Sequence, residues 1–200
     1  MSRYTGPKRR LSRREGVALF AKDAKSIERK GANPPGMRGI KFRKRFSEYG
    51  MQLREKQKAK RLFGLSERQF KNLFDLAAKT RGATGLKLLE LLELRLDNVV
   101  YRLGFASSRM EARQIVGHGH INVDGKKNNI PSFRVKVDHV VAISPKFVDN
   151  TQVKKNLEAS STLPEWLERK ATVGKVLRVP NREEMEQIIN EQLIVEFYSR

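Results

Sequence analysis

The histidine pair at positions 118 and 120 is the first feature of this 200-residue sequence that could do chemistry, because two such rings can bind a metal. The remaining ligands would have to come from Asp124 or Asp138. The surrounding charge is positive, and a basic setting repels a cation. We therefore expect no metal. We interpret His118 as a group near the C-terminal end of a helix, where partial positive charge is favourable.

The triplet Arg95-Leu96-Asp97 is a second candidate, because some pseudouridine synthases with a small RNA-binding domain use an aspartate in this context. Here the triplet falls inside a predicted helix, and no second domain is available to build a catalytic cleft. We expect Asp97 to pair with a basic residue of its own helix or to cap local structure. Phosphate-loop, zinc-protease and nucleophile-elbow patterns are absent as well, so no enzyme, catalytic residue or cofactor is predicted.

Arginines after this triplet suit the binding of phosphate. Arg109 and Arg113 are four residues apart and share one helical face, opposite the apolar face of that helix. Guanidinium groups match phosphate oxygens better than lysine does. Gln114 and Lys126 could join them if a following hairpin lies alongside. For these residues taken alone, a solvated helix face that binds nothing is the alternative interpretation.

Capping residues and glycines predict the elements that position these groups. Ser108 with Glu111 forms a capping box, which predicts a helix from Arg109. Gly117 and Gly119 allow the backbone to leave that helix. The Asp-Gly pair at positions 124–125 predicts a hairpin turn. Strands are predicted over residues 120–123, 133–137 and 140–143.

Three helices are predicted before this region. Ser47 caps the first, which Gly64 ends, and Ser66 with Gln69 begins the second. The third runs unbroken to Gly104, with an apolar stripe at helical spacing that comprises Leu89, Leu92, Leu96, Val99 and Leu103.

Both ends of the sequence carry further predicted helices. Ser12 with Glu15 predicts a helix over residues 13–23, and Asn181 with Glu184 predicts a last helix that extends through Leu193. Another is predicted near residues 151–158. The final stretch LIVEFYSR is too apolar for a loose tail, so we expect it to dock on the helical region or on a partner. The predicted protein–protein contacts are Ile194, Val195, Phe197 and Tyr198.

Positive charge is the strongest signal in the composition. The chain has 42 basic and 22 acidic residues, a formal net charge of +20. Residues 1–60 hold 19 basic and 5 acidic residues, a net of +14. Such self-repulsion favours a polyanionic partner, with nucleic acid first and an anionic membrane surface second. No run approaches the roughly 18 apolar residues of a membrane span, and the absence of cysteine excludes disulfides and thiolate zinc sites.

Residues 1–46 are predicted to form an extended basic arm with one short helix. Prolines and glycines in GANPPGMRG break regular structure, and KFRKRF interleaves cations with phenylalanine. We expect the arm to order on its partner. The predicted RNA-binding residues are Arg3, Lys8, Arg9, Arg10, Arg13, Arg14, Lys41, Arg43, Lys44, Arg45, Arg54, Lys58, Arg61, Arg68, Lys71, Arg109, Arg113, Gln114 and Lys126.

Several motifs resemble a known family. The stretch LELRLDNVVYRLGFASSRMEARQIVGHGHINVDGKKNNIPSFRVKV is similar to the αL RNA-binding domain named after small-subunit ribosomal protein four. The flanking MSRYTGPKRRLSRREG, YGMQLREKQKAKRLFGLSERQF, PEWLE and INEQLIVEFYSR resemble the ribosomal protein family itself, of bacterial or organellar type. Some relatives hold zinc through cysteines in the N-terminal region. This chain has no cysteine there, so the resemblance implies an arm without metal.

The resemblance implies a structural protein of the small ribosomal subunit, either cytoplasmic or organellar. Such proteins bind a multi-helix junction in the 5′ domain of ribosomal RNA early in assembly. They also contact small-subunit protein five, at an interface linked to decoding accuracy, and lie near the path of messenger RNA. Some repress their own messenger. Neither a small-molecule substrate nor a membrane is expected.

The predicted fold is α+β, with a basic arm, a helical domain and an inserted αL-type RNA-binding domain of two helices and a small hairpin-rich sheet. The alternatives are an RNA-modifying enzyme and a free-standing RNA-binding regulator or messenger repressor. The predicted domains are the arm at residues 1–46, helices at 47–90 joined by 172–200, the αL domain at 91–150 and a connecting segment at 151–171.

Overall fold

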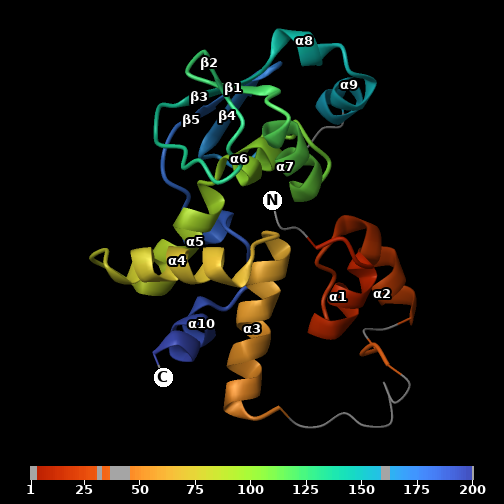
Figure 1. The fold of residues 1–200 in the computed structure, drawn as a ribbon, viewed down its shortest axis with the longest axis vertical. Helices are drawn as coiled ribbons and strands as arrows, with labels where there is room; N and C mark the ends of the chain where they lie inside the picture. Colours follow the sequence, from red (N-terminus) through yellow and green to blue (C-terminus); the bar gives the residue numbers. More distant parts are fainter. Residues whose placement is uncertain (1–3, 31–32, 37–45, 159–162, 200) are drawn as a thin grey trace. The chain divides into compact units, whose positions relative to one another are not determined.

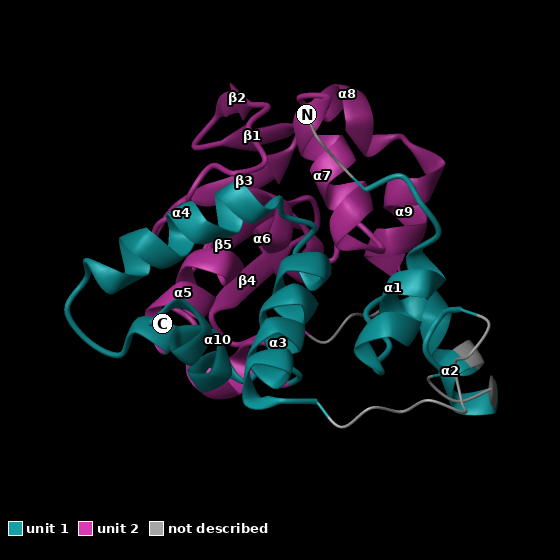
Figure 2. Cartoon of the chain, turned by 60° about the horizontal axis from the view of Figure 1, so that its bottom comes forward, with its two compact units in different colours: residues 1–85, 188–200 teal, residues 86–187 magenta. Residues whose placement is uncertain are grey.

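The computed structural model describes residues 4–30, 33–36, 46–158 and 163–199, and it divides the chain into two compact units. Residues 1–85 and 188–200 form the first, which we call the helical unit (Figure 2). Residues 86–187 form the second, the sheet unit. Together they confirm the predicted α+β fold class.

Capping side chains begin the two main helices of the helical unit where the sequence predicts them. The Ser47 hydroxyl accepts the Gly50 N–H at 3.2 Å, and Ser66 forms a complete capping box with Gln69. Gly64 takes a φ of 64°, which ends the first of these helices. The described elements of the unit are α1 (Lys8–Glu15), η1 (Ala21–Asp23), α2 (Ala24–Lys30), α3 (Glu48–Leu62), α4 (Glu67–Ala78) and α10 (Glu191–Tyr198).

The C-terminal helix α10 packs against α3, which confirms that the last residues dock on the helical region. Ile194 is fully buried, and the Tyr198 ring stacks on Phe74 with 4.4 Å between centroids. The Lys56 ammonium lies over the Phe197 ring, 4.4 Å from its centroid. Apolar burial and aromatic contacts thus hold the two ends of this unit together.

The helix predicted over residues 13–23 is wrong. The chain forms α1 from Lys8 instead, and Gly16 ends that helix in the left-handed conformation with a φ of 75°. Ser12 lies inside α1 and caps nothing. It is buried, and its hydroxyl donates to the Asp23 carboxylate at 2.5 Å, so it links α1 to η1.

The sheet unit consists of helices packed against one antiparallel sheet of five strands. Its order is β2-β1-β3-β5-β4 (Figure 1). The elements are α5 (Thr84–Glu93, which begins at the boundary), α6 (Leu96–Arg102), α7 (Arg109–Gly117), β1 (Ile121–Val123), β2 (Lys126–Asn128), β3 (Val140–Ile143), α8 (Pro145–Val148), α9 (Thr151–Glu158), β4 (Leu167–Lys170), β5 (Val173–Val176) and η2 (Arg182–Glu184).

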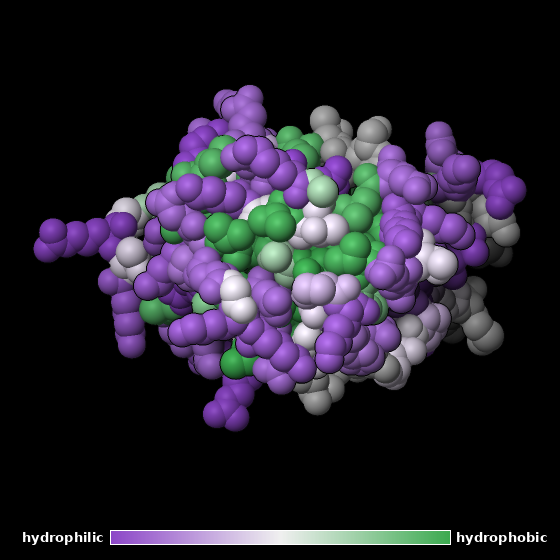
Figure 3. All heavy atoms as spheres, turned by 90° about the horizontal axis from the view of Figure 1, so that it is seen from above, coloured by the Kyte–Doolittle hydropathy of each residue, from purple (hydrophilic) through white to green (hydrophobic). Residues whose placement is uncertain are grey.

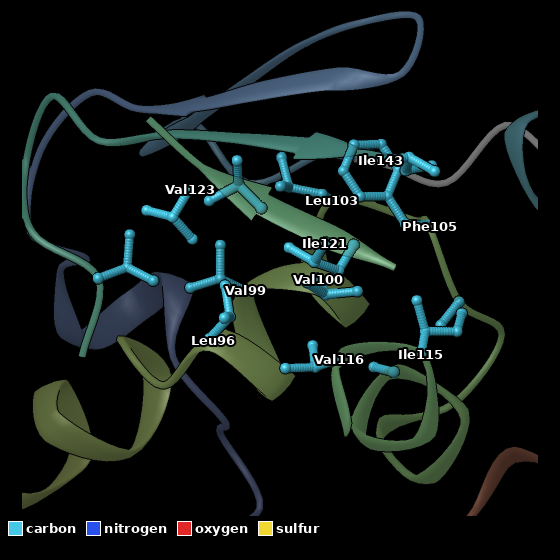
Figure 4. Packing of buried hydrophobic residues seen from close by; sticks show 14 of the residues in the cluster. Leu96, Val99, Val100, Leu103, Phe105, Ile115, Val116, Ile121, Val123 and Ile143 are labelled. Carbon is cyan, nitrogen blue, oxygen red and sulfur yellow. The ribbon is translucent and has the colours of Figure 1, made fainter. Parts of the chain in front are cut away.

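Alternation along the strands places the core between the sheet and α6 and α7. Ile121 on β1 pairs with Ile143 on β3, and both side chains face the helices (Figure 4). In Figure 4 Ile121 lies beside Val100 from α6 and Ile143 beside Phe105, and Val116 from α7 belongs to the same buried cluster. Burial of this apolar stripe is the main force that joins the two helices to the sheet.

The turn chemistry of the first hairpin is confirmed. Asp124 and Gly125 have φ angles of 49° and 77°, the two positive values that a type I′ turn needs. Gly119 has a φ of 73° and lets the chain leave α7 for β1. Val123 and Lys126 form the register pair beside the turn.

A break at Arg95 divides the helix that the sequence predicts as continuous into α5 and α6. The Arg95 backbone is extended, with ψ at 139°, and forms an isolated bridge to Arg134. The Leu96 N–H donates to the Phe133 carbonyl at 2.8 Å. The strand predicted over residues 133–137 is therefore also wrong, because this segment pairs with the helix break and lies outside the sheet.

The last third of the sheet unit differs from the predicted boundaries. Strands β4 and β5 complete the sheet through the β3–β5 pairing, so residues 163–187 are part of the unit rather than a connector or a piece of the helical domain. The capping box of Asn181 and Glu184 closes only the short η2, and Met185 after it is extended. The last helix begins at Glu191, capped by Asn190, rather than at residue 182.

We predict that Gly174→Ala destabilises the protein by about 1–3 kcal/mol, because overpacking a core contact forces neighbours to move. A Cβ at position 174 would lie 2.5 Å from the methyl carbons of Leu103. Gly50→Ala is the matched control. Its nearest neighbours would be 3.4 Å away, and it lies in α3, where alanine is favourable. Urea denaturation measures both, and equal effects would contradict the close packing at Gly174.

Candidate nucleic-acid interface

Buried carboxylates and arginines form a polar cluster where α5, α6 and α7 meet. Glu93 is 1% exposed and accepts hydrogen bonds from Asn98 Nδ2 at 2.6 Å and from both Nε and Nη2 of Arg102, at 3.1 and 2.8 Å. Arg102 also pairs with Glu186 at 3.2 Å. Burial lowers the pKa of Arg102, but the facing Glu93 and Glu186 outweigh it and raise that pKa above its ordinary value.

Arg109 belongs to this cluster rather than to a free surface. Its Nε donates to Asn98 Oδ1 at 2.7 Å, its Nη2 forms an ion pair with Glu186, and its guanidinium lies 4.7 Å from the centroid of the Tyr101 ring. The side chain is only 13% exposed. Burial would raise the pKa of Glu186, but the charges of Arg109 and Arg102 hold it below its usual value.

Asp97 pairs with Arg95 through two hydrogen bonds, at 3.1 and 2.9 Å, and with Arg113 at 3.5 Å. The prediction that it pairs with a basic residue is confirmed, although its partners are the extended Arg95 and a residue on α7. Burial lowers the pKa of Arg113, which is 16% exposed. Both arginines thus face internal carboxylates, so the alternative interpretation of a solvated helix face is wrong. Their contact with RNA stays a prediction.

The hairpin and the end of α7 carry exposed polar groups in the sheet unit. Gln114 and Lys126 are exposed, as expected of RNA-binding residues. Lys127, which is not among the predicted residues, lies across Gly119, with its Nζ 3.0 Å from where a Cβ would be. Arg134 is also exposed. The alternation of the hairpin could have indicated Lys127, whose neighbour Lys126 points to the opposite face.

The predicted RNA-binding cations of the helical unit fall into two groups. Lys8, Arg9, Arg10 and Arg14 on α1 and Arg68 and Lys71 on α4 are exposed, and no ion pair joins them to a described residue. The others are engaged: Arg54 and Arg61 pair with Glu15, Lys58 with Glu55, and Arg13 donates to the carbonyls of Asn33 and Pro34. Arg3, Lys41, Arg43, Lys44 and Arg45 lie outside the described residues.

Most acidic side chains form ion pairs or hydrogen bonds with residues of the same chain. Positive charge is therefore unpaired only where a cation has no acidic neighbour. Glu15 has a side chain with no exposed area, between Arg54 and Arg61. Glu67 pairs with Lys56 and Lys60, both at 2.7 Å or less. Figure 3 shows hydrophilic side chains around an apolar centre on one face. The cations without an acidic neighbour are thus the ones that an external anion can neutralise.

The histidines do not assemble a metal site with the aspartates. The Asp124 carboxylate accepts the Val140 N–H at 2.8 Å and lies 3.8 Å from His139, while Asp138 pairs with Lys175. No group of three His, Cys, Asp or Glu side chains that could hold a metal occurs in the described part of the chain. None of the described helices is long and apolar enough to cross a membrane.

The four residues predicted to contact other proteins lie on α10, and one of them is buried. Ile194 is fully buried within the helical unit, so an external contact by that side chain is wrong. Val195, Phe197 and Tyr198 are partly exposed. Their role stays a prediction, and each also has a packing role inside the unit.

Comparisons with known proteins cover the whole chain. Residues 3–93 match the family model described as the ribosomal protein S4/S9 N-terminal domain, and residues 94–141 match the S4 domain. The small ribosomal subunit protein uS4 of Chloroflexus aurantiacus is 53% identical over 208 residues, with 100% of both chains covered. Proteins of that name from Dictyoglomus turgidum, at 52%, and Symbiobacterium thermophilum (uS4A), at 51%, are similar over their full lengths too.

We predict that Arg109→Ala lowers the free energy of unfolding by about 2–4 kcal/mol, because it removes one of the two arginines that pair with the partly buried Glu186 carboxylate and also removes the hydrogen bond to Asn98 Oδ1. Lys126→Ala is the matched control at an exposed position and is expected to change stability by less than about 0.5 kcal/mol. Chemical denaturation followed by circular dichroism measures both variants. An Arg109→Ala variant as stable as the wild type would contradict the structural role of this cluster.

Proposed function

The chain belongs to the ribosomal protein S4 family, and we propose that it is a structural protein of the small ribosomal subunit that binds small-subunit ribosomal RNA. This proposal rests on the division of the chain's cations into two groups. Buried arginines neutralise the internal carboxylates, whereas exposed cations on α1, α4 and the β1–β2 hairpin have no acidic partner among the described residues. A polyanion supplies the missing negative charge.

We propose that shape and phosphate position supply most of the recognition of RNA. The exposed groups that would meet RNA are long cations on helices, which reach phosphate oxygens but discriminate poorly between bases. The helical unit contributes Lys8, Arg9, Arg10, Arg68 and Lys71, and the arm residues that lie outside the described part would add to them. The sheet unit contributes Gln114, Lys126 and Lys127 from a rigid scaffold.

Family membership supports the finer parts of the proposal. We propose that the RNA site is a multi-helix junction of the 5′ domain, that binding occurs early in assembly of the subunit body, and that the chain contacts small-subunit protein five and lies near messenger RNA. Val195, Phe197 and Tyr198 are the partly exposed side chains proposed for protein contacts. The proposed location is the ribosome of the cytoplasm.

A free-standing RNA-binding regulator or messenger repressor is the second candidate, because the same unpaired cations would serve it equally well. Co-sedimentation with small subunits at moderate salt separates the two. A ribosomal protein stays with the subunit, whereas a free-standing regulator is recovered in the soluble fraction.

We predict that wild-type affinity for small-subunit RNA falls by roughly 10³–10⁵ between 50 and 200 mM salt, which corresponds to about 6–10 phosphate contacts by analogy with duplex DNA. The triple variant Lys8→Ala, Arg9→Ala, Arg10→Ala should reduce the slope of log affinity against log salt by about 2–3, roughly one for each phosphate that is no longer neutralised. Filter binding across a salt series measures the slope.

The matched control removes three lysines that already face an acid. Lys154, Lys170 and Lys175 pair with Asp149, Glu168 and Asp138, at 3.0, 3.1 and 2.9 Å. Replacing these three with alanine removes the same formal charge and should leave the slope nearly unchanged. An equal reduction in slope for the two triple variants would mean that net charge alone drives binding and would contradict the proposed surface.

A further inference from the structure

A hollow of about 330 Å³ lies at the C-terminal end of α7, bounded by the start of β1 and by α8 and α9. This volume is at the lower end of the roughly 300–1,000 Å³ that small-ligand sites occupy. All its lining residues belong to the sheet unit, and of these only Gln114 has been assigned to RNA binding. Its lining combines flat rings with side-chain amides.

Two parallel, stacked rings form one wall of the hollow. His120 and Phe147 stack with 3.9 Å between centroids and 6° between planes. His118, which is exposed, meets His120 at 66° and 6.0 Å. Burial and the charges of His118 and Lys127 lower the pKa of His120, which favours the neutral form of its ring. A further flat ring can extend or cap such a wall.

Amide side chains line the hollow beside these rings. Gln114 is exposed at the end of α7. Asn150 Oδ1 accepts the Gln152 N–H at 2.9 Å, which fixes the Asn150 side chain and leaves its amide N–H groups for another acceptor. The paired donors and acceptors of amides match the edges of nucleobases, and unpaired bases present those edges.

Lys127 lies next to the hollow, and Glu111, the acidic residue in the lining, accepts hydrogen bonds from neighbouring residues. Lys127 crosses Gly119, the residue between the two histidines, whose φ of 73° favours glycine there. Glu111 accepts the Ser107 N–H at 2.7 Å and the Ser107 hydroxyl at 2.6 Å with one oxygen, while its other oxygen accepts from Asn156. These neutral donors direct the Glu111 carboxylate towards Ser107 and Asn156, and Lys127 is the cation beside the rings that can bind an anion.

We propose that this hollow receives one unpaired nucleobase of RNA, with the adjoining phosphate held by Lys127. The site rests on the proposed RNA-binding function and adds a base-sized subsite to it. It gives the His118-x-His120 pair a role as ring and edge contacts of a base, and Gln114 with Asn150 read the edge of that base.

The three histidines of the chain give a direct test, because His139 lies outside the hollow, stacked on Phe133. The Cε1–H resonances of the full-length protein are followed by NMR during titration with adenosine monophosphate into the millimolar range, and with ribose 5-phosphate as the probe that lacks a base. We expect saturable shifts of His118 and His120 with adenosine monophosphate, little change with ribose 5-phosphate, and no change at His139.

Phe147→Leu keeps an apolar side chain but removes the ring plane, and Gln114→Ala removes an exposed amide. Each is expected to weaken nucleotide binding by about fivefold or more, as removal of one stacking or hydrogen-bonding partner of a base does. Lys155→Ala, an exposed change on α9 outside the lining, is the control and should have no effect.

Equal shifts with ribose 5-phosphate would overturn the proposal in favour of a simple phosphate site. The absence of saturable shifts, or unchanged binding in Gln114→Ala and Phe147→Leu, would overturn it as well. Filter binding of the wild type to small-subunit RNA tests the proposed function separately. If the protein binds RNA but shows no histidine shifts with adenosine monophosphate, the proposed base site is wrong and the proposed function stands. If the shifts occur but the protein does not bind small-subunit RNA, the proposed ribosomal function is wrong and the hollow is a nucleotide site.

Discussion

Ion pairs between buried carboxylates and arginines join the helices of the sheet unit, and they decide which cations are left for a partner. Glu93 and Glu186 hold Arg102 and Arg109, while Asp97 holds Arg95 and Arg113. Breaking such a pair on one side leaves an uncompensated charge in a region of low dielectric, so the arginines are constrained in place. The cluster also fills the helix break at Arg95, where an apolar stripe alone would have favoured a continuous helix.

The arginines of this chain therefore differ in whether an acidic residue lies beside them. Arg109 is as basic in sequence as Arg9, but it is 13% exposed and faces Glu186, whereas Arg9 is exposed on α1. The second kind has no acidic neighbour to displace before it exchanges its counterions for phosphate. A protein with a net charge of +20 needs both kinds, because the first keeps the sheet unit rigid and the second meets the polyanion.

Local signals in the sequence predicted what local interactions determine. Ser47, Ser66 and the Asp124-Gly125 turn act on residues within four positions, and all three features are confirmed. The errors come from distant partners. Arg134 breaks the long helix from 39 positions away, and Glu186 binds Arg109 from 77 positions away. Strands β4 and β5 pair only because β3 offers an edge, and nothing in their own alternation marks them out. Family resemblance identified the fold class because it draws on the whole chain.

Chemical footprinting of naked small-subunit RNA with the full-length chain tests the central claim most directly. A scaffold with fixed clusters of unpaired cations should protect one compact set of nucleotides, at a single multi-helix junction, and that protection should persist at moderate salt. Protection spread evenly along the RNA would show that the positive charge only coats the polyanion, and it would contradict the account.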